Sequence, residues 1–242
     1  MPPAEAGMLL RRAAGTLGEG FSELLWPTRC VGCNLPGGLL CPSCEEGLER
    51  IERRWSCPVC GAPYGWLTCT ACERDWTELD GCVCALSFGG TSARLVSVHK
   101  DGHERRLAPL IARLMAEAIP EEWRAEGAGL DAIVFVPATA RAFARRGFDH
   151  MESVANELSR FIDAPVADVL VREEGHDQRG LGREERALNL EGRVFAVEDV
   201  AGMRILLVDD VITTGASIRA CAAALKERGA SEVRGLALAR VW

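Results

Sequence analysis

The segment R-I-L-L-V-D-D-V-I-T-T-G-A-S, residues 204–217, decides the fold of this chain. Its run I-L-L-V is apolar at every position, which is typical of a central parallel strand that helices cover on both faces. Two adjacent carboxylates, Asp209 and Asp210, follow at the carboxyl end of this strand, where open α/β sheets bind ligands. The small residues 213–217 then lead into a helix-like stretch, whose backbone N–H groups and hydroxyls can bind a phosphate.

The two carboxylates would repel a phosphate unless they bind something else, and ribose hydroxyls or Mg²⁺ would satisfy them. The segment therefore predicts a sugar-phosphate site. Nucleoside triphosphatases also contain V-D-D strands, but they need a G-x-x-x-x-G-K-[ST] loop, and this chain has no Gly-Lys dipeptide. A response-regulator pocket would need several more strand–helix units than the remaining chain supplies.

The rest of residues 81–242 repeats the same alternation of strands and helices, which predicts an α/β domain with a mostly parallel sheet and flanking helices. We expect helices over residues 94–99, 103–118, 150–161 and 216–228. The charged segment 173–189 contains three glycines and few apolar residues. A segment of this length without a hydrophobic pattern is expected to form a mobile, functional loop. The apolar runs of strand length are C-V-C-A-L-S-F, A-I-V-F-V, V-A-D-V-L-V, R-V-F-A-V, R-I-L-L-V and V-R-G-L-A-L-A.

Composition limits the function further. The formal net charge of −7 over 242 residues argues against a general electrostatic grip on nucleic acid. No apolar run is long enough to span a bilayer, and residues 1–26 show no secretory leader. These residues instead place Leu17, Phe21, Leu24 and Leu25 at helical spacing, which predicts an N-terminal amphipathic helix. We therefore expect a cytoplasmic protein without a membrane span.

Four C-x-x-C pairs lie within residues 27–80 and predict a double zinc ribbon with two structural zinc sites. Disulfides are disfavoured by the expected reducing compartment, and a redox C-x-x-C motif would normally occur once. A region of this size cannot build a sufficient hydrophobic core alone. Metal binding would therefore contribute to its folding. Sequential and interleaved pairing both remain open. In the sequential arrangement the sites are Cys30, Cys33, Cys41 and Cys44, and Cys57, Cys60, Cys69 and Cys72.

The chain resembles a known family along nearly its whole length. The segment V-D-D-V-I-T-T-G-A-S matches the phosphoribosyl pyrophosphate (PRPP) motif of type I phosphoribosyltransferases. The segments V-P-A-T-A-R-A-F-A-R-R-G-F-D-H, from residue 136, and Q-R-G-L-G-R-E-E-R-A-L-N, from residue 178, resemble motifs of the competence-protein-F (ComF) family. That family also has a double zinc ribbon ahead of its phosphoribosyltransferase domain.

The resemblance implies roles for individual residues. Asp209 and Asp210 would bind the ribose hydroxyls and, with Arg146, form the catalytic set, with Mg²⁺ bound alongside PRPP. Arg145 and Lys100 would contact the pyrophosphate. Asp149 and His150 stand where the family commonly has Asn and Gln, and a carboxylate and an imidazole make different hydrogen bonds to an acceptor from those of two amides. The 5′-phosphate would lie against Thr213, Thr214, Gly215, Ala216 and Ser217, and the mobile loop would contribute Gln178, Arg183, Arg186 and Asn189.

Two functions follow from this resemblance. The first is a PRPP- and Mg²⁺-dependent transfer of phosphoribosyl to an unknown nitrogen acceptor, linked to competence and DNA uptake. The second is a non-catalytic sensor of PRPP or a nucleotide that assists competence-machinery proteins in handling incoming single-stranded DNA. No catalytic base is evident in the sequence. The transfer does not demand one, because it depends mainly on stabilising a cationic ribosyl transition state and the leaving pyrophosphate.

Overall fold

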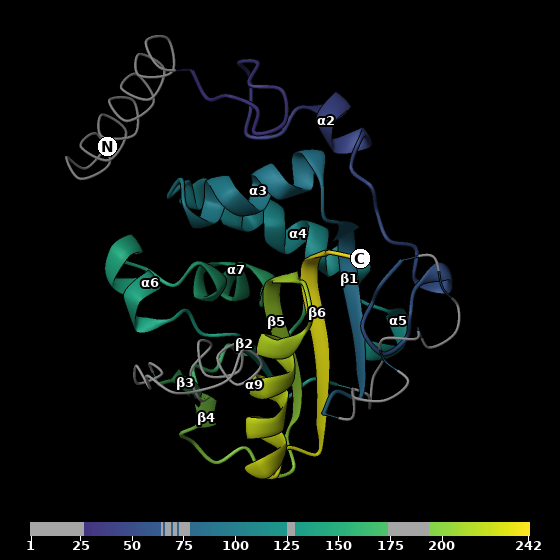
Figure 1. The fold of residues 1–242 in the computed structure, drawn as a ribbon, viewed down its shortest axis with the longest axis vertical. Helices are drawn as coiled ribbons and strands as arrows, with labels where there is room; N and C mark the ends of the chain where they lie inside the picture. Colours follow the sequence, from purple (N-terminus) through teal and green to yellow (C-terminus); the bar gives the residue numbers. More distant parts are fainter. Residues whose placement is uncertain are drawn as a thin grey trace, which may run out of the picture. The chain divides into compact units, whose positions relative to one another are not determined.

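The computed structural model describes residues 27–63, 65, 69, 72, 78–124, 129–173 and 194–242 (Figure 1). The chain divides into two compact units, Met1–Gly47 and Leu48–Trp242. The expected helix over residues 1–26 and nearly all of the expected loop over residues 173–189 lie outside the described residues. In the first unit, the described chain forms a cysteine-containing turn followed by the short helix α2 (Pro42–Glu46).

A four-stranded parallel sheet forms the centre of the second unit and confirms the predicted α/β fold. Its strands are β1 (Gly81–Ser87), β2 (Ala132–Phe135), β5 (Arg204–Ile212) and β6 (Glu232–Arg240), in the spatial order β1-β6-β5-β2. The run I-L-L-V lies in β5, between β6 and β2, and residues 205–208 are completely buried. The continuous apolar pattern therefore marks a central strand, as the sequence predicts.

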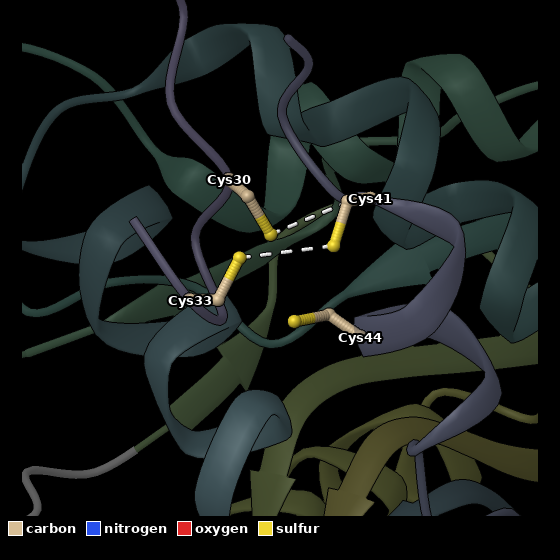
Figure 2. A group of neighbouring side chains, drawn as sticks. All are labelled: Cys30, Cys33, Cys41 and Cys44. Carbon is tan, nitrogen blue, oxygen red and sulfur yellow. Dashed lines mark hydrogen bonds between the residues drawn. The ribbon is translucent and has the colours of Figure 1, made fainter. Parts of the chain in front are cut away.

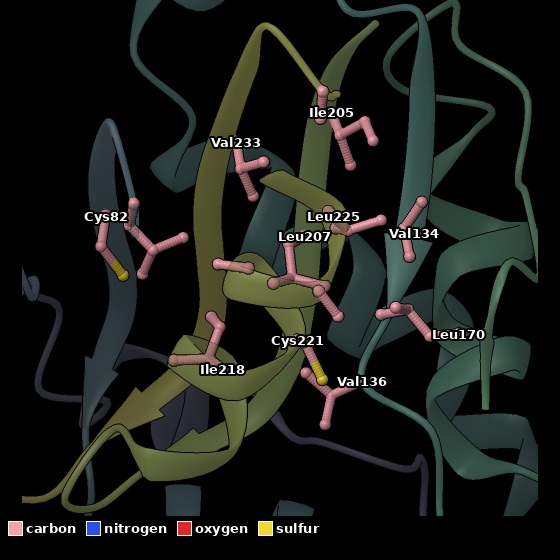
Figure 3. Packing of buried hydrophobic residues seen from close by; sticks show 14 of the residues in the cluster. Cys82, Val134, Val136, Leu170, Ile205, Leu207, Ile218, Cys221, Leu225 and Val233 are labelled. Atoms are coloured by element: carbon pink, nitrogen blue, oxygen red, sulfur yellow. The ribbon is translucent and has the colours of Figure 1, made fainter. Parts of the chain in front are cut away.

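Helices cover both faces of this sheet. Helix α9 (Ala216–Glu227) packs along β5 and β6, and Figure 3 shows Ile218, Cys221 and Leu225 of α9 in one buried cluster with Ile205 and Leu207 of β5. Helix α7 (His150–Leu158) packs on β2 and β5, and α4 (Ala108–Ala118) packs on β1 and β6 and against α7. Helix α3 (Gly90–Lys100) follows β1 and ends at Lys100.

The structure differs from the sequence-based expectations in several elements. An unexpected helix, α6 (Ala140–Arg146), begins where the Thr139 hydroxyl accepts a hydrogen bond from the Ala142 N–H, and Gly147 ends it in a left-handed conformation. These capping signals are readable in the sequence. The helix expected over residues 103–118 divides into η2 (Arg105–Leu107) and α4, and His103 lies before both with a positive φ of 58°. Strands β3 (Leu170–Arg172) and β4 (Val194–Ala196) form a separate antiparallel pair.

Two further short elements complete the second unit: η1 (Arg53–Trp55) and α5 (Glu121–Arg124). Within the residues that the structure describes, no helix has the length and apolar character needed to cross a membrane.

Candidate sugar-phosphate site and metal centres

Asp209 and Asp210 lie inside the last part of β5 and are both buried, at 8% and 9% exposure. Consecutive side chains of a strand point to opposite faces of a sheet. Asp209 shares the face of Ile205 and Leu207, which pack against α9, whereas the Asp210 carboxylate contacts residues at the ends of α3 and α7. The adjacent pair that the sequence treats as one motif therefore occupies two environments.

The Asp210 carboxylate accepts two strong hydrogen bonds through Oδ2. Lys100 Nζ donates at 2.6 Å and His150 Nε2 at 2.9 Å. Burial alone would raise the pKa of Asp210, but the hydrogen bond from His150 and the charge of Lys100 outweigh burial and hold it well below its ordinary value. By contrast, burial raises the pKa of Asp209 well above its ordinary value, and the nearby charge of Asp210 raises it further. The pKa values of the two neighbouring carboxyl groups are therefore shifted in opposite directions.

The two arginines of α6 differ in burial. The Arg146 side chain is only 5% exposed; its Nη1 lies 3.3 Å from His150 Nδ1 and its Nη2 donates to Asp101 Oδ1 at 3.3 Å. Arg145 is 67% exposed and donates to the same Asp101 oxygen at 3.1 Å. A neutral His150 with its proton on Nε2 satisfies both contacts, donating to Asp210 and accepting from Arg146. The structure thus links Arg146 to Asp210 through His150, places Lys100 on the same Asp210 oxygen, and leaves Arg145 at the surface.

The predicted phosphate loop lies between β5 and α9. Thr213 and Thr214 are exposed, and Gly215 adopts a left-handed conformation with φ of 82° at the N-cap of the 12-residue helix α9. Glycine reaches this conformation without the steric cost that other residues incur. The Thr214 hydroxyl accepts a hydrogen bond from the Ala216 N–H at 3.3 Å. Hydroxyls and the positive end of a helix therefore surround one small, exposed turn, an arrangement suited to an anion.

Asp149 has a structural position that the sequence did not reveal. It is the N-cap of α7: its Oδ1 accepts from the N–H groups of Met151 and Glu152, and its Oδ2 accepts from the Ala138 N–H at 2.7 Å. These bonds tie the chain after β2 to the start of α7 and so fix His150 beside Asp210.

His99, in the last turn of α3, is buried, which its position in the sequence does not reveal. It is 2% exposed, and its two ring nitrogens lie 3.1 and 3.2 Å from the carbonyl oxygens of Glu104 and His150. Burial lowers the pKa of His99 below its ordinary value, although the two carbonyl contacts favour the charged ring.

Arg172, at the end of β3, is a further candidate that the sequence analysis missed. Its Nε and Nη2 atoms are buried and have no hydrogen-bond partner among the described residues, and its charge acts on Asp209. A motif search could not find it, because it lies outside the sequence motifs and comes near Asp209 only in the folded chain. The loop residues Gln178, Arg183, Arg186 and Asn189 lie outside the described residues.

The first four-cysteine group shows that the pairing is sequential. The Sγ atoms of Cys30, Cys33, Cys41 and Cys44 lie within 4.8 Å of one another, and Figure 2 shows all four pointing toward a common centre. The Cys33 and Cys41 sulfurs are 3.7 Å apart. Zinc–sulfur bonds of about 2.3 Å in a tetrahedron require sulfurs about 3.8 Å apart, so the group can hold a zinc-like ion.

The second group, Cys57, Cys60, Cys69 and Cys72, repeats this arrangement inside the second unit. In both groups the third cysteine donates its N–H to the first cysteine's Sγ at 3.3 Å. Cys57 and Cys60 are completely buried and belong to the hydrophobic cluster under α9. A Cβ on Gly61 would lie 2.8 Å from Cys84 Sγ, so this turn packs directly on β1. The second group is therefore part of the core of its unit.

Comparisons with known proteins agree with this fold. Residues 129–241 match the family described as phosphoribosyl transferase domain. Competence protein F of Haemophilus influenzae is 26% identical over 224 residues, covering 88% of this chain and 96% of that protein. DNA utilization protein YhgH of Salmonella typhi is 28% identical over 223 residues, covering 88% of this chain and 97% of that protein.

Among solved structures, an allosteric regulatory enzyme of purine biosynthesis aligns with 54% of this chain and 25% of its own, at 21% identity and a TM-score of 0.36. The two sequence relatives, by contrast, align over almost their entire lengths, across both the cysteine-rich region and the α/β region. The chain is therefore similar to competence protein F and its relatives along nearly its whole length, and residues 129–241 match a phosphoribosyl transferase domain.

Proposed function

We propose that the second unit binds PRPP with Mg²⁺ and transfers its phosphoribosyl group to a nitrogen acceptor. The observation that carries this proposal is the exposed turn of Thr213 and Thr214 with left-handed Gly215, at the start of α9 and directly after two buried carboxylates. The turn supplies donors for a 5′-phosphate, and the carboxylates can accept hydrogen bonds from ribose hydroxyls or bind the hydrated magnesium ion.

The residues around Asp210 suit the pyrophosphate end of such a ligand. Lys100 and Arg145 are partly or largely exposed cations, and Arg146 lies behind them against His150. In the transfer, the bond from ribose C1 to the pyrophosphate oxygen breaks with its electron pair leaving on pyrophosphate. A nitrogen lone pair forms the new C1–N bond, and that nitrogen then releases a proton to water. The cations would stabilise the charge that develops on the departing pyrophosphate.

Titration calorimetry with PRPP and Mg²⁺ tests the binding step. We expect binding by the wild-type protein, and a loss of affinity of roughly tenfold or more in Asp210→Asn and in Gly215→Ala, which would strain the phosphate turn. Asp163→Asn is the matched control, because Asp163 is an exposed aspartate distant in sequence from the β5 motif. Failure of the wild-type protein to bind PRPP would disprove the proposal.

A non-catalytic role is favoured by one observation: Oδ2 of Asp210 already accepts hydrogen bonds from both Lys100 and His150. A sensor that holds PRPP or a nucleotide without turnover fits such a preformed network. Pyrophosphate release separates the two functions. Release that depends on an added base, amine or oligonucleotide indicates a transferase, whereas binding without release with any of these acceptors indicates a sensor.

The names of the relatives, which refer to competence and DNA utilization, suggest that this chain also serves DNA uptake. A cavity of about 530 Å³ beside η1 is lined by Arg53, Arg54 and Trp123, among other residues, and Arg54 stacks 5.5 Å from the ring centre of the half-exposed Trp55. Cations and aromatic rings together are typical of single-strand binding surfaces. We expect salt-sensitive binding of single-stranded DNA that weakens in Arg54→Glu. The control is Arg160→Glu, which changes an exposed arginine far from Arg54 in the sequence and should leave binding unchanged.

We further propose that both cysteine groups bind structural zinc. Each group has four cysteine sulfurs at the spacing of a tetrahedral site, and a shell of four thiolates leaves no open position for catalysis. Metal analysis of the full chain should find two zinc ions per molecule, and one in a variant that lacks the first group.

A further inference from the structure

Arg240 is a buried arginine at the carboxyl edge of the central sheet. It is the last residue of β6 and pairs in register with Ile212 of β5 on one side and Ser87 of β1 on the other. Its residue exposure is only 7%. The carboxyl edge of a parallel sheet is where this fold class binds ligands, so a buried cation at this point needs an explanation.

The guanidinium group of Arg240 contacts two parts of the molecule. Its Nη1 donates to the carbonyl oxygen of Ile212 at 3.0 Å, and also to the carbonyl oxygens of Thr213 and Val241. Its Nη2 lies 3.9 Å from Cys60 Sγ. One side chain therefore touches both the entry to the phosphate turn and a ligand sulfur of the second cysteine group.

The charge of Arg240 has no carboxylate partner within the described part of the chain. A buried cation is costly unless an opposite charge compensates it. Four neutral thiols provide no such charge, but a divalent metal held by four thiolates has a net double negative charge. The second cysteine group fits such a metal by its sulfur spacing and burial. Metal binding would thus supply the counter-charge that keeps Arg240 in place.

An ion pair also joins the same two regions. Arg219, in the first turn of α9, donates to Glu78 through Nε and Nη2, both at 3.1 Å. Glu78 follows the last cysteine of the second group, Cys72, by six positions. Arg240 therefore links Cys60 to the start of the turn, and the Glu78–Arg219 pair links the segment after the second cysteine group to the chain just after the turn.

We propose that Arg240 couples metal binding by Cys57, Cys60, Cys69 and Cys72 to the conformation of residues 212–217, and so makes PRPP affinity depend on the second metal. Arg240 acts as a positioning residue: it touches the backbone of the turn and a metal-ligand sulfur, not the sugar phosphate. The part of this inference that concerns PRPP rests on the function proposed above. The coupling between metal and turn stands on the contacts of Arg240 alone.

Zinc release and hydrogen exchange test the coupling in the full-length, zinc-loaded chain. Arg240→Gln removes the charge and the donor fork, and we expect zinc affinity at the second site to fall roughly 10–100-fold, as for other groups that support metal ligands. Backbone amides of residues 212–217 should exchange faster. Arg240→Lys keeps the positive charge but lacks the paired N–H donors of the guanidinium group. It should therefore retain more zinc than Arg240→Gln, while the amides of residues 212–217 still exchange faster than in the wild type. Arg234→Gln, on the same strand, is the control and should change neither readout.

A direct measurement on the wild-type protein avoids any folding defect of the variants. Removal of the second zinc with a chelator, followed by mass-spectrometric metal counting, should accelerate exchange in residues 212–217, and loss of the first zinc alone should not. Unchanged exchange after loss of the second zinc would overturn the coupling. PRPP affinity should fall in parallel, by roughly tenfold or more, if that ligand binds. If PRPP binds no form of the protein, the proposed function fails, while the zinc and exchange results still decide the role of Arg240.

Discussion

His150 Nε2 lies 2.9 Å from Asp210 Oδ2, on the face of β5 opposite Asp209. Lys100 Nζ contacts the same Asp210 oxygen at 2.6 Å, so two side chains hold this carboxylate. Asp209 accepts a hydrogen bond from the Asp210 N–H at 2.9 Å, and burial is the main reason that the pKa of Asp209 is raised. Two adjacent, chemically identical residues are therefore expected to affect stability in opposite directions.

The substitution Asp210→Asn should destabilise the second unit at neutral pH by roughly 1.5–3 kcal/mol, because Lys100 and His150 lose a charged partner. The lowered pKa of Asp210 means that its contribution is present above the ordinary pKa near 3.8 and is lost as pH falls through the folded value. Urea denaturation near pH 7 measures the loss. A variant as stable as the wild type would contradict the contacts of Asp210.

Asp209→Asn should stabilise the protein at neutral pH. Because the folded pKa of Asp209 is raised, its stabilising effect is complete below pH 3.8 and declines as pH rises toward the folded value. Asparagine can keep the hydrogen bond to the Asp210 N–H and cannot ionise. The advantage of the variant should therefore grow between about pH 4 and pH 7. A constant difference across this range would show that the Asp209 carboxyl does not titrate abnormally.

His99 should make stability fall on mild acidification. Its pKa is lowered by burial, so the unfolded chain gains a proton near the ordinary value of 6.5 while the folded chain resists it. Stability is then lost as pH falls below about 6.5 toward the folded pKa, by at most about 1.4 kcal/mol per pH unit for one group. Unfolding midpoints between about pH 5 and pH 7.5 should show a shallower dependence in His99→Gln than in the wild type. His103→Gln, which changes an exposed imidazole, is the control.

Asp149→Ala should cost roughly 1–3 kcal/mol, because α7 loses its N-cap and the Ala138 N–H loses its acceptor. For a chain of this size that corresponds to a fall of about 2–4 °C in Tm per kcal/mol. Asp149→Asn can keep the cap through its amide oxygen, but its NH₂ group cannot accept the hydrogen bond from the Ala138 N–H. Its cost should therefore be smaller than that of Asp149→Ala. Equal costs for both variants would point away from the cap. Thermal unfolding measures both.

Loss of the first cysteine group and loss of the second should have different effects on the Tm of the second unit. Cys60→Ser affects a completely buried sulfur in the core of the second unit, so it should lower the Tm of the phosphoribosyl transferase domain by several degrees. Cys33→Ser affects an exposed sulfur in the first unit and should remove zinc without that loss. Calorimetry with metal analysis on both variants gives the comparison, and a fall of similar size in both would contradict it.

Much of the site could be predicted because its residues are close together in sequence. The strand I-L-L-V, the carboxylates and the glycine turn form one continuous segment, and local geometry alone places the turn between a strand and a helix. Asp101, Arg172 and Arg240 could not be predicted in the same way, because they come from other elements. The burial of His99 was also missed, since a single histidine at the end of a helix has the same pattern whether it faces solvent or a neighbouring helix.

The sequence by itself determined the parallel α/β architecture, the position of the turn between β5 and α9 and the identity of eight metal-ligand candidates. Hydrophobic periodicity and motif spacing are local properties of the sequence, so they can be read without knowledge of the fold. Only the tertiary structure decided the sequential cysteine pairing, the separation of Asp209 from Asp210 by the sheet, and the contact of Arg240 with both Cys60 and the turn. These depend on strand order and register, which bring together residues as far apart as Cys60 and Arg240 through long-range packing.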